Sequence, residues 1–287
     1  MLILDQLQQA ADFTATEQRI ATYILAHLST VTDLYIKDLA TATYTSHSAI
    51  IRLAQKLGYR GYREFQRALS TAAITQAQTV QKVDPNFPFD PTDDDQLIAK
   101  KMADLTVTTV QKSFAQLDIP TLTAIATELM QANRLFIFAQ GDSQLRARSF
   151  QNKLVKINRF AIIADEYADA AWNAANIGPN DCAFFISYGG TTQVHQQFAQ
   201  YFHDQQLPSV LLTGNPQSPL LPLTQYHLVS MQSETSFAKI GTFASQAAFE
   251  YLLDSLFAVM YAQNFKHHLT DLQHKQQLIQ NGPLHNK

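Results

Sequence analysis

The chain has 287 residues, of which 46% are hydrophobic and 16% charged, so it is long enough for about two domains with ordinary buried cores. Its one cysteine, Cys182, excludes an internal disulfide, and the apolar neighbours indicate a buried, unreactive thiol in a reducing compartment. No apolar run approaches about 18 residues and no basic, cleavable leader opens the chain, so we expect a soluble cytoplasmic protein without a membrane span or secretion signal.

The first well-marked helix is expected to begin after Thr14. Glu17 follows three residues later, a spacing that forms a capping box, in which each side chain accepts a hydrogen bond from the other residue's backbone N–H. The apolar residues that follow recur with helical spacing and predict a face packed into a core: Ile20, Tyr23, Ile24 and Leu28.

Two shorter helices come next, joined by the polar tripeptide "TYT". The first is marked by Ile36, Leu39 and Ala40. Ser46 is suited to cap the start of the second helix, and Gly58 is suited to end it. The inner face predicted for this second helix consists of Ile50, Leu53, Ala54 and Leu57. Two short helices joined by a tight turn describe a helix-turn-helix.

In that motif the second helix enters the DNA major groove with its N-terminal residues leading. Those leading residues are His47, Ser48 and Ala49, directly after the cap residue Ser46. The side chains of Ser46, His47 and Ser48 can bond base edges. Arg52, one turn further on, can reach a guanine or a phosphate. Three more basic residues suit phosphates, which set affinity rather than sequence choice: Lys56, Arg60 and Arg63. A helical hairpin without a role at DNA remains the alternative.

Charge is concentrated in the same part of the chain. Residues 1–77 have a net charge of +1 and residues 78–287 a net charge of −4. Between residues 46 and 77 five basic residues face one acid, Glu64, which gives +4. A solvated basic face and a phosphate-contacting surface are both compatible with this pattern.

The segment "FTATEQRIATYILAHLSTVTDLYIKDLATATYTSHSAIIRLAQKLGYRGYREFQRAL" resembles the N-terminal domain of RpiR-type transcriptional regulators. The resemblance spans about residues 1–77 and implies an operator-binding domain. One position departs from the family pattern, because Tyr44 stands in the turn where the family usually has glycine. If that position requires a positive φ, the tyrosine is strained there and the turn differs in shape.

A proline-containing stretch at residues 78–96 interrupts helical periodicity. We therefore predict an all-α helix-turn-helix domain at 1–77, a linker at 78–100 and an α/β domain at 101–287. Five short apolar runs in that domain alternate with helical stretches: 134–139, 160–165, 182–187, 209–214 and 227–231. Such runs predict a five-stranded parallel sheet sandwiched by helices.

Two of these strands are followed by glycines and hydroxyls, in "AQGDS" and "SYGGTT". In parallel α/β folds ligands bind at the carboxyl ends of strands, and the N-terminus of the following helix favours an anion. The two loops lack a cation, which suits a phosphate monoester on a hydroxylated body. Ordinary capped turns are the alternative. The candidate ligand-binding residues are Gly141, Ser143, Ser187, Gly189, Gly190 and Thr192.

These loops resemble those of the sugar isomerase (SIS) domain, over about residues 105–265, which also covers "GNPQSPL", "SETSF" and, as the final helix, "FEYLLDSLFAVMY". The resemblance implies a phosphosugar ligand held by Ser143, Ser187 and Thr192, with Glu234 as a sugar contact or, in enzymes, a base. Ala139 replaces a family glycine, and Gly189 replaces a serine that would contact phosphate.

The histidines give no metal-binding pattern. His195, one turn into the helix after "SYGGTT", is expected to be a surface or helix residue. His267 and His268 are expected in a polar tail, without partnered ligands nearby. We therefore expect no metal, no cofactor and no catalytic residue.

Together these patterns indicate a regulator that binds a double-stranded DNA operator and responds to a phosphosugar effector. We expect a homodimer, or a dimer of dimers, with the apolar segment 243–265 either at the subunit interface or buried within one subunit. Two alternatives stay open at this point: a phosphosugar isomerase or lyase, and a DNA-binding protein whose degenerate SIS domain only dimerises.

Overall fold

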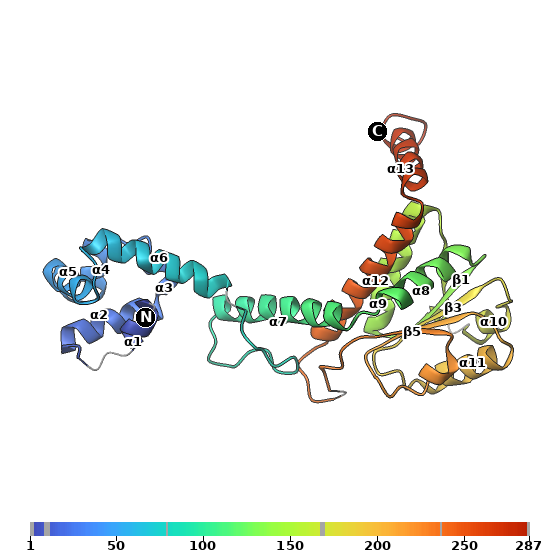
Figure 1. Cartoon of the computed structure of the whole chain (residues 1–287), viewed down its shortest axis with the longest axis horizontal. Helices are drawn as coiled ribbons and strands as arrows, with labels where there is room; N and C mark the ends of the chain where they lie inside the picture. The colour runs from blue at the N-terminus through green and yellow to red at the C-terminus, as the bar shows by residue number, and fades with distance from the viewer. Residues whose placement is uncertain (1–2, 9–11, 79, 167–169, 236, 286–287) are drawn as a thin grey trace. The chain divides into compact units, whose positions relative to one another are not determined.

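The structure is a computed structural model that describes residues 3–8, 12–78, 80–166, 170–235 and 237–285. The chain divides into two compact units, Met1–Val80 and Gln81–Lys287 (Figure 1). None of the helices in the described ranges is long and apolar enough to cross a membrane.

The first unit is entirely helical, as its periodicity predicts. Its core is built from one face of each helix and includes Ile20, Ile24, Ile50, Leu53 and Phe65. The capping box is confirmed, because the Thr14 amide donates to Glu17 and the Glu17 amide donates to the Thr14 hydroxyl. The helices are α1 (Ile3–Gln8), α2 (Ala15–Ala26), α3 (Leu28–Val31), α4 (Ile36–Ala42), α5 (His47–Lys56) and α6 (Tyr62–Gln78).

Helices α4 and α5 form the expected helix-turn-helix, and the turn between them has a defined geometry. The Thr45 amide donates to the Ala40 carbonyl at 2.9 Å and the Tyr44 amide donates to the Thr41 carbonyl at 3.2 Å. This is a Schellman motif, with Tyr44 at the left-handed position and a φ of 51°. The turn therefore does require a positive φ, and the tyrosine adopts it.

The second unit contains a five-stranded, all-parallel sheet of order β2-β1-β3-β4-β5, as predicted. Its central strands are buried along their whole length, which explains why they read as continuous apolar runs. Cys182 is buried in β3, and burial raises the pKa of its thiol. The strands are β1 (Leu135–Ala139), β2 (Ala161–Ile163), β3 (Cys182–Ile186), β4 (Ser209–Thr213) and β5 (Tyr226–Val229).

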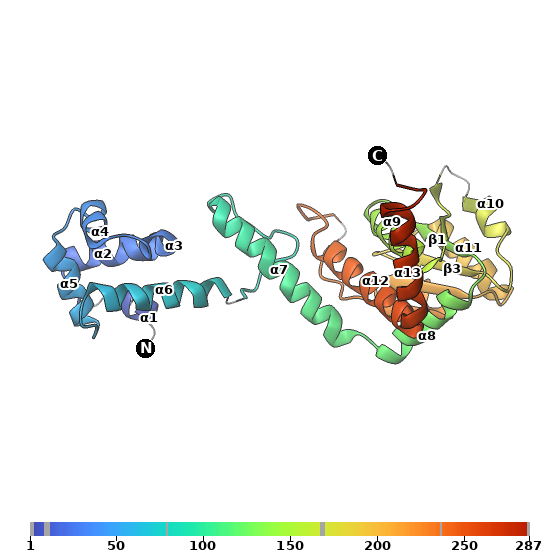
Figure 2. The same ribbon diagram turned by 90° about the horizontal axis from the view of Figure 1, so that it is seen from above.

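Helices cover both faces of this sheet (Figures 1 and 2). On one face α8 (Ile119–Gln131), α9 (Asp142–Leu154) and α12 (Ala244–Gln263) form the main core with alternate strand residues. On the other face α10 (Ala170–Ala175) and α11 (Gln193–Asp204) pack against a phenylalanine-rich cluster. The remaining elements are α7 (Asp95–Gln116), η1 (Val155–Ile157), η3 (Leu221–Leu223) and α13 (Phe265–Gln280).

Two features differ from the sequence-based expectations. The family resemblance made α12 the final helix, which is wrong, because α13 follows it. His268, expected in a polar tail, is buried there, and its Nδ1 lies 3.0 Å from the Tyr261 carbonyl. Helix α12 buries Phe249, Leu256 and Met260 within the unit.

The segment that follows α6 makes defined contacts within the second unit. Residues 81–94, which we predicted as part of a linker, belong to the second unit and are held there by side chains. Asn86 accepts hydrogen bonds from the Thr235 amide at 2.7 Å and hydroxyl at 3.1 Å. The Asn86 carbonyl also accepts from the Ile240 amide at 2.9 Å.

Candidate functional site

The start of α5 has the form that a DNA-reading helix needs. Ser46 caps it, since its hydroxyl accepts from the Ala49 amide at 3.2 Å. Ser46, His47 and Ser48 are all exposed at the tip, while Ala49 and Ile50 begin the buried face. Arg52 is exposed one turn on, and its guanidinium has no hydrogen-bond or ion-pair partner within the described ranges. These four side chains are available to another molecule.

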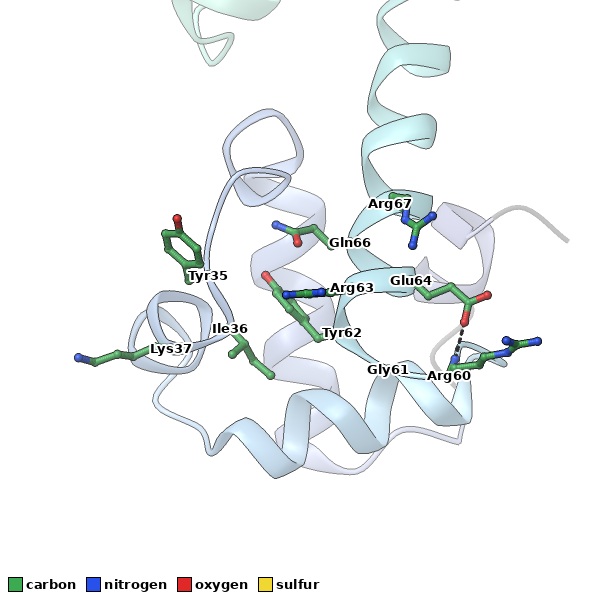
Figure 3. Close-up of a pocket in the computed structure, with 10 residues that line it drawn as sticks. All are labelled: Tyr35, Ile36, Lys37, Arg60, Gly61, Tyr62, Arg63, Glu64, Gln66 and Arg67. Carbon is green, nitrogen blue, oxygen red and sulfur yellow. Dashed lines mark hydrogen bonds between the residues drawn. The ribbon is translucent and has the colours of Figure 1, made fainter.

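A basic hollow of about 1000 Å³ lies between the start of α4 and the start of α6 (Figure 3). Its lining includes the basic residues Lys37, Arg60, Arg63 and Arg67 together with Tyr35 and Tyr62. The Tyr62 side chain is held in place because its hydroxyl donates to the Leu34 carbonyl at 2.7 Å. Glu64 is the one carboxylate among its described lining residues, and it accepts from the Arg60 amide at 2.7 Å.

Lys56 differs from the other predicted phosphate contacts. Its ammonium lies 2.9 Å from Glu17 and 2.5 Å from the Asp12 carbonyl, and 5.2 Å from the centre of the Phe13 ring. The Thr14 amide and Lys56 together hold the pKa of Glu17 below its ordinary value. Lys56 thus joins α5 to the start of α2, and this bonding competes with any contact to DNA.

The second unit brings the two hydroxyl-bearing loops to one edge of its sheet. Strands β1 and β3 are neighbours, and their pairing runs to Ala139↔Ile186. Ser143 follows β1 and Ser187 follows β3, so both leave the sheet at the same edge. Ser143 is buried, and its hydroxyl has no partner among the described residues, whereas the Ser187 hydroxyl accepts from the Gly190 amide at 3.2 Å.

Both helices that follow these strands begin without a side-chain cap in the described structure. Helix α9 starts after Gly141, and α11 starts after Thr192, whose hydroxyl does not bond its own helix. The first N–H groups of each helix therefore lack the usual internal acceptor. Two uncapped helix N-termini beside unpaired hydroxyls can donate hydrogen bonds to the oxygens of an anion.

The glycines of these loops differ in whether the backbone requires a glycine at their position. Gly141 has a φ of 57° and a ψ of −135°, a region that only glycine visits readily. Gly190 has a φ of 60°, and a Cβ there would lie 2.3 Å from the Ser218 hydroxyl oxygen. At Gly189 the nearest atom to an added Cβ is the Thr191 hydroxyl oxygen at 3.6 Å, so a side chain fits.

Glu234 is buried, with 3% exposure, and both of its carboxylate oxygens are engaged. Ser245 donates to them from its amide at 2.9 Å and its hydroxyl at 2.7 Å, so Glu234 caps the start of α12. Lys239 lies 3.4 Å from the same carboxylate. The contact of Glu234 with a sugar stays a prediction.

Tyr188 and Lys239 are residues near the two loops that sequence reasoning missed. The Tyr188 hydroxyl accepts from the amides of Ser233 and Glu234, at 3.0 and 3.2 Å, and so ties the "SYGGTT" loop to the Glu234 loop. The Lys239 ammonium lies 5.9 Å from the centre of the Tyr188 ring. The region therefore has a cation, which the two loops alone did not offer. No local sequence pattern links positions this far apart.

His195 is on α11, as expected, but it is not at the surface. Its Nε2 lies 2.8 Å from Asp165, which follows β2, and the exposures of the two side chains are 1% and 2%. Phe138 and Phe185 pack around the ring. The remaining His195 nitrogen and Asp165 oxygen have no partner within the described part of the chain. The pair joins the end of β2 to α11.

The chain matches two family models. Residues 1–76 match the helix-turn-helix domain of the rpiR family, and residues 128–275 match the SIS domain.

Relatives along most of the chain carry the same class of name. The chain is 28% identical over 256 residues to an uncharacterised HTH-type transcriptional regulator of Caldanaerobacter subterraneus subsp. tengcongensis, covering 88% of each. It is 25% identical over 243 residues to an uncharacterised regulator of that type from Providencia stuartii, covering 84% of each.

Two solved structures extend the comparison. Vibrio vulnificus NanR, complexed with ManNAc-6P, is 25% identical, matches with a TM-score of 0.60 and covers 99% of both chains. The sugar isomerase domain of a Sphaerobacter thermophilus RpiR transcription factor is 14% identical, with a TM-score of 0.55, and covers 62% of this chain and 97% of its own. The second likeness is one of fold.

The fold and the two sites define a two-domain protein in which a helix-turn-helix precedes an α/β unit of the sugar isomerase type. The chain belongs to the rpiR family of helix-turn-helix transcriptional regulators and has a SIS domain as its second unit.

Proposed function

We propose that this regulator binds its operator through α5 and the basic hollow, and that a phosphorylated sugar held by the SIS unit alters that binding. The proposed binding of a sugar phosphate rests on one observation, the pair of uncapped helix N-termini at neighbouring strand ends. The unpaired hydroxyls of Ser143 and Thr192 lie beside these N-termini. Such a site offers a phosphate several donors and two positive dipole ends.

The other groups near these helix N-termini suit a sugar phosphate better than a bare anion. Ser187 and the backbone of Gly189 and Gly190 would supply polar groups in a loop whose glycines allow a ligand to approach closely. Lys239 adds one cation, and Glu234 offers an acceptor for sugar hydroxyls if Ser245 shares it. The NanR structure, similar over 99% of both chains, contains ManNAc-6P, which supports a ligand of this class.

The DNA half uses the exposed tip of α5. Ser46, His47 and Ser48 would meet base edges, Arg52 a guanine or a phosphate, and Arg60 and Arg63 would neutralise phosphates from the hollow. Lys56 was in the predicted phosphate set, but its bonds to Glu17 and Asp12 favour a structural role. We expect a homodimer in the cytoplasm, presenting two α5 helices to half-sites about 34 Å apart or a multiple of that spacing.

A regulator fits the geometry of Glu234 better than a phosphosugar isomerase does. A general base needs a carboxylate oxygen within reach of the proton that it removes. Both oxygens of Glu234 are already engaged by Ser245, and one also faces Lys239. We therefore assign Glu234 to positioning α12 and its neighbouring loop rather than to catalysis.

We call the hydrogen bonds that Asn86 accepts from Thr235 and Ile240 the clasp at Asn86. Through this clasp, ligand binding would affect the DNA-binding unit. Thr235 and Ile240 both bond Asn86. Thr235 directly follows Glu234 in the sequence, and Ile240 directly follows Lys239, which lies beside the Glu234 carboxylate. A ligand that moves Thr235 or Ile240 would change the bonds of the segment that follows α6. Ligand binding to the SIS unit would then favour one arrangement of the two DNA-binding units of the dimer over another.

Isothermal titration of the full-length protein with a panel of sugar phosphates tests the ligand half. We expect one class to bind and its dephosphorylated sugar to fail. Ser143→Ala should weaken that binding about tenfold, the effect of one lost hydrogen bond to a charged group. Thr270→Ala removes a hydroxyl that bonds only within α13 and should change nothing. Failure of every sugar phosphate to bind would leave a SIS unit that only dimerises.

A further inference from the structure

The helix-turn-helix contains the same terminating motif twice, with a different residue at the critical position. Helix α4 ends with Tyr44 at the left-handed position, and α5 ends with Gly58 there, at a φ of 90°. At α5 the Tyr59 amide donates to Ala54 at 2.9 Å and the Gly58 amide donates to Gln55 at 3.0 Å, as at α4. Glycine adopts this backbone without strain, whereas tyrosine does not.

Nothing within the described structure compensates for the tyrosine. Tyr44 is 86% exposed, and its hydroxyl has no hydrogen-bond partner among the described residues. The turn is held by its neighbours instead. Thr43 donates to the Leu39 carbonyl at 2.7 Å, and the Thr43 and Thr45 hydroxyls lie 2.8 Å apart. The Tyr44 side chain is therefore exposed on a hydrogen-bonded turn and has no structural role within the described residues.

The surroundings of Tyr44 match a DNA backbone. It lines a shallow hollow with Lys37, Thr41, Thr45, Ser46 and His47, directly before the tip of α5. The described lining residues bring one cation and several hydroxyls, and they include no carboxylate. Tyrosine hydroxyls and lysines at the rim of a reading helix are typical phosphate contacts, which fix the register of the helix on the duplex.

We propose that Tyr44 is a DNA-contacting residue whose hydroxyl donates a hydrogen bond to a backbone phosphate beside the groove that α5 enters. This inference rests on the proposed operator binding. The contact is a neutral donor, so it contributes affinity without releasing a counterion. It also explains why a residue that the turn itself disfavours stands where glycine would fit.

The test measures duplex affinity against salt for the full-length protein, using a duplex selected by the wild type from random sequences. Tyr44→Phe should lower affinity about tenfold, the effect of a lost hydrogen bond to a charged group, and leave the slope of log affinity against log salt unchanged. Arg63→Ala should lower that slope by about 0.9. Tyr201→Phe, a matched change on α11, should bind as the wild type does.

Tyr44→Gly guards against an effect on folding. It should raise the melting temperature, because glycine relieves the left-handed turn, and still lose affinity. Unchanged affinity in both Tyr44 variants, with a wild type that selects and binds a duplex, overturns this inference alone. A wild type that selects no duplex overturns the proposed operator binding as well.

Discussion

Gly189 and Gly190 are adjacent, yet only one of them must be glycine. Gly190 has a positive φ and no room for a Cβ beside Ser218, whereas Gly189 has space for one. The family resemblance places a phosphate-contacting serine at Gly189, so this chain lacks a donor that its backbone could carry. The donor is missing because of the residue at position 189, since the loop backbone there could carry a serine.

Restoring that donor should strengthen ligand binding. Gly189→Ser should tighten the affinity for the cognate sugar phosphate by about 1.5–3 kcal/mol, the range for one hydrogen bond to a charged group. Gly190→Ser is the matched control and should lower stability, because its side chain would collide with Ser218 and Thr213. Titration and thermal melting of both variants check this, and equal behaviour of the two would refute the distinction.

Lys56 and Arg52 lie on the same helix but should respond differently to truncation. Lys56→Ala should lower the free energy of unfolding by up to about 1 kcal/mol, because its ion pair with Glu17 is partly exposed. Arg52→Ala should leave stability unchanged and cost about 1–3 kcal/mol of operator affinity with relaxed choice at one base. Lys56→Ala with normal stability and a reduced salt slope would return Lys56 to the phosphate contacts.

Among the elements, α5 was the best specified by sequence. Its cap, inner face and end were each given by local residues: Ser46 at the start, Ile50 and Leu53 inside, and Gly58 at the end. The three central strands were equally clear, because burial on both faces makes them continuously apolar. Local signals of this kind depend on residues within a turn or two of one another.

The features that sequence missed depend on distant partners. Glu234 gains its cap role from Ser245, His195 its burial from Asp165, and Asn86 its place from Thr235. Helix α13 was read as a polar tail because only His268 is buried along it. None of these relations follows from spacing, since each appears only when the sheet assembles.

The end of α5 gives a stability test for the repeated terminating motif. Gly58→Ala should lower the free energy of unfolding by about 1–2 kcal/mol, the cost of placing a Cβ in the left-handed region. An added Cβ meets nothing within 4 Å among the described residues, so the loss would come from backbone conformation alone. Chemical denaturation measures it, and an unchanged midpoint would argue against the motif's left-handed position.

For the molecule as a whole, the clasp at Asn86 is the proposed link between effector and operator. Asn86→Ala removes the side-chain acceptor of Thr235 but leaves the Ile240 bond to the backbone. We expect sugar-phosphate and operator affinities measured separately to stay within about twofold, while the effect of one on the other shrinks. Asn152→Ala, an exposed position on α9, should keep the full effect. Intact coupling in Asn86→Ala would place the route elsewhere.

The most direct test of the account is operator affinity with and without the sugar phosphate at saturation. Fluorescence anisotropy of a labelled duplex against full-length protein measures it, and calorimetry under the same conditions shows that the site is occupied. The account predicts a change of at least about fivefold, the lower end of ordinary allosteric coupling, and no change with the dephosphorylated sugar. Identical operator affinity with the SIS unit fully occupied would contradict it.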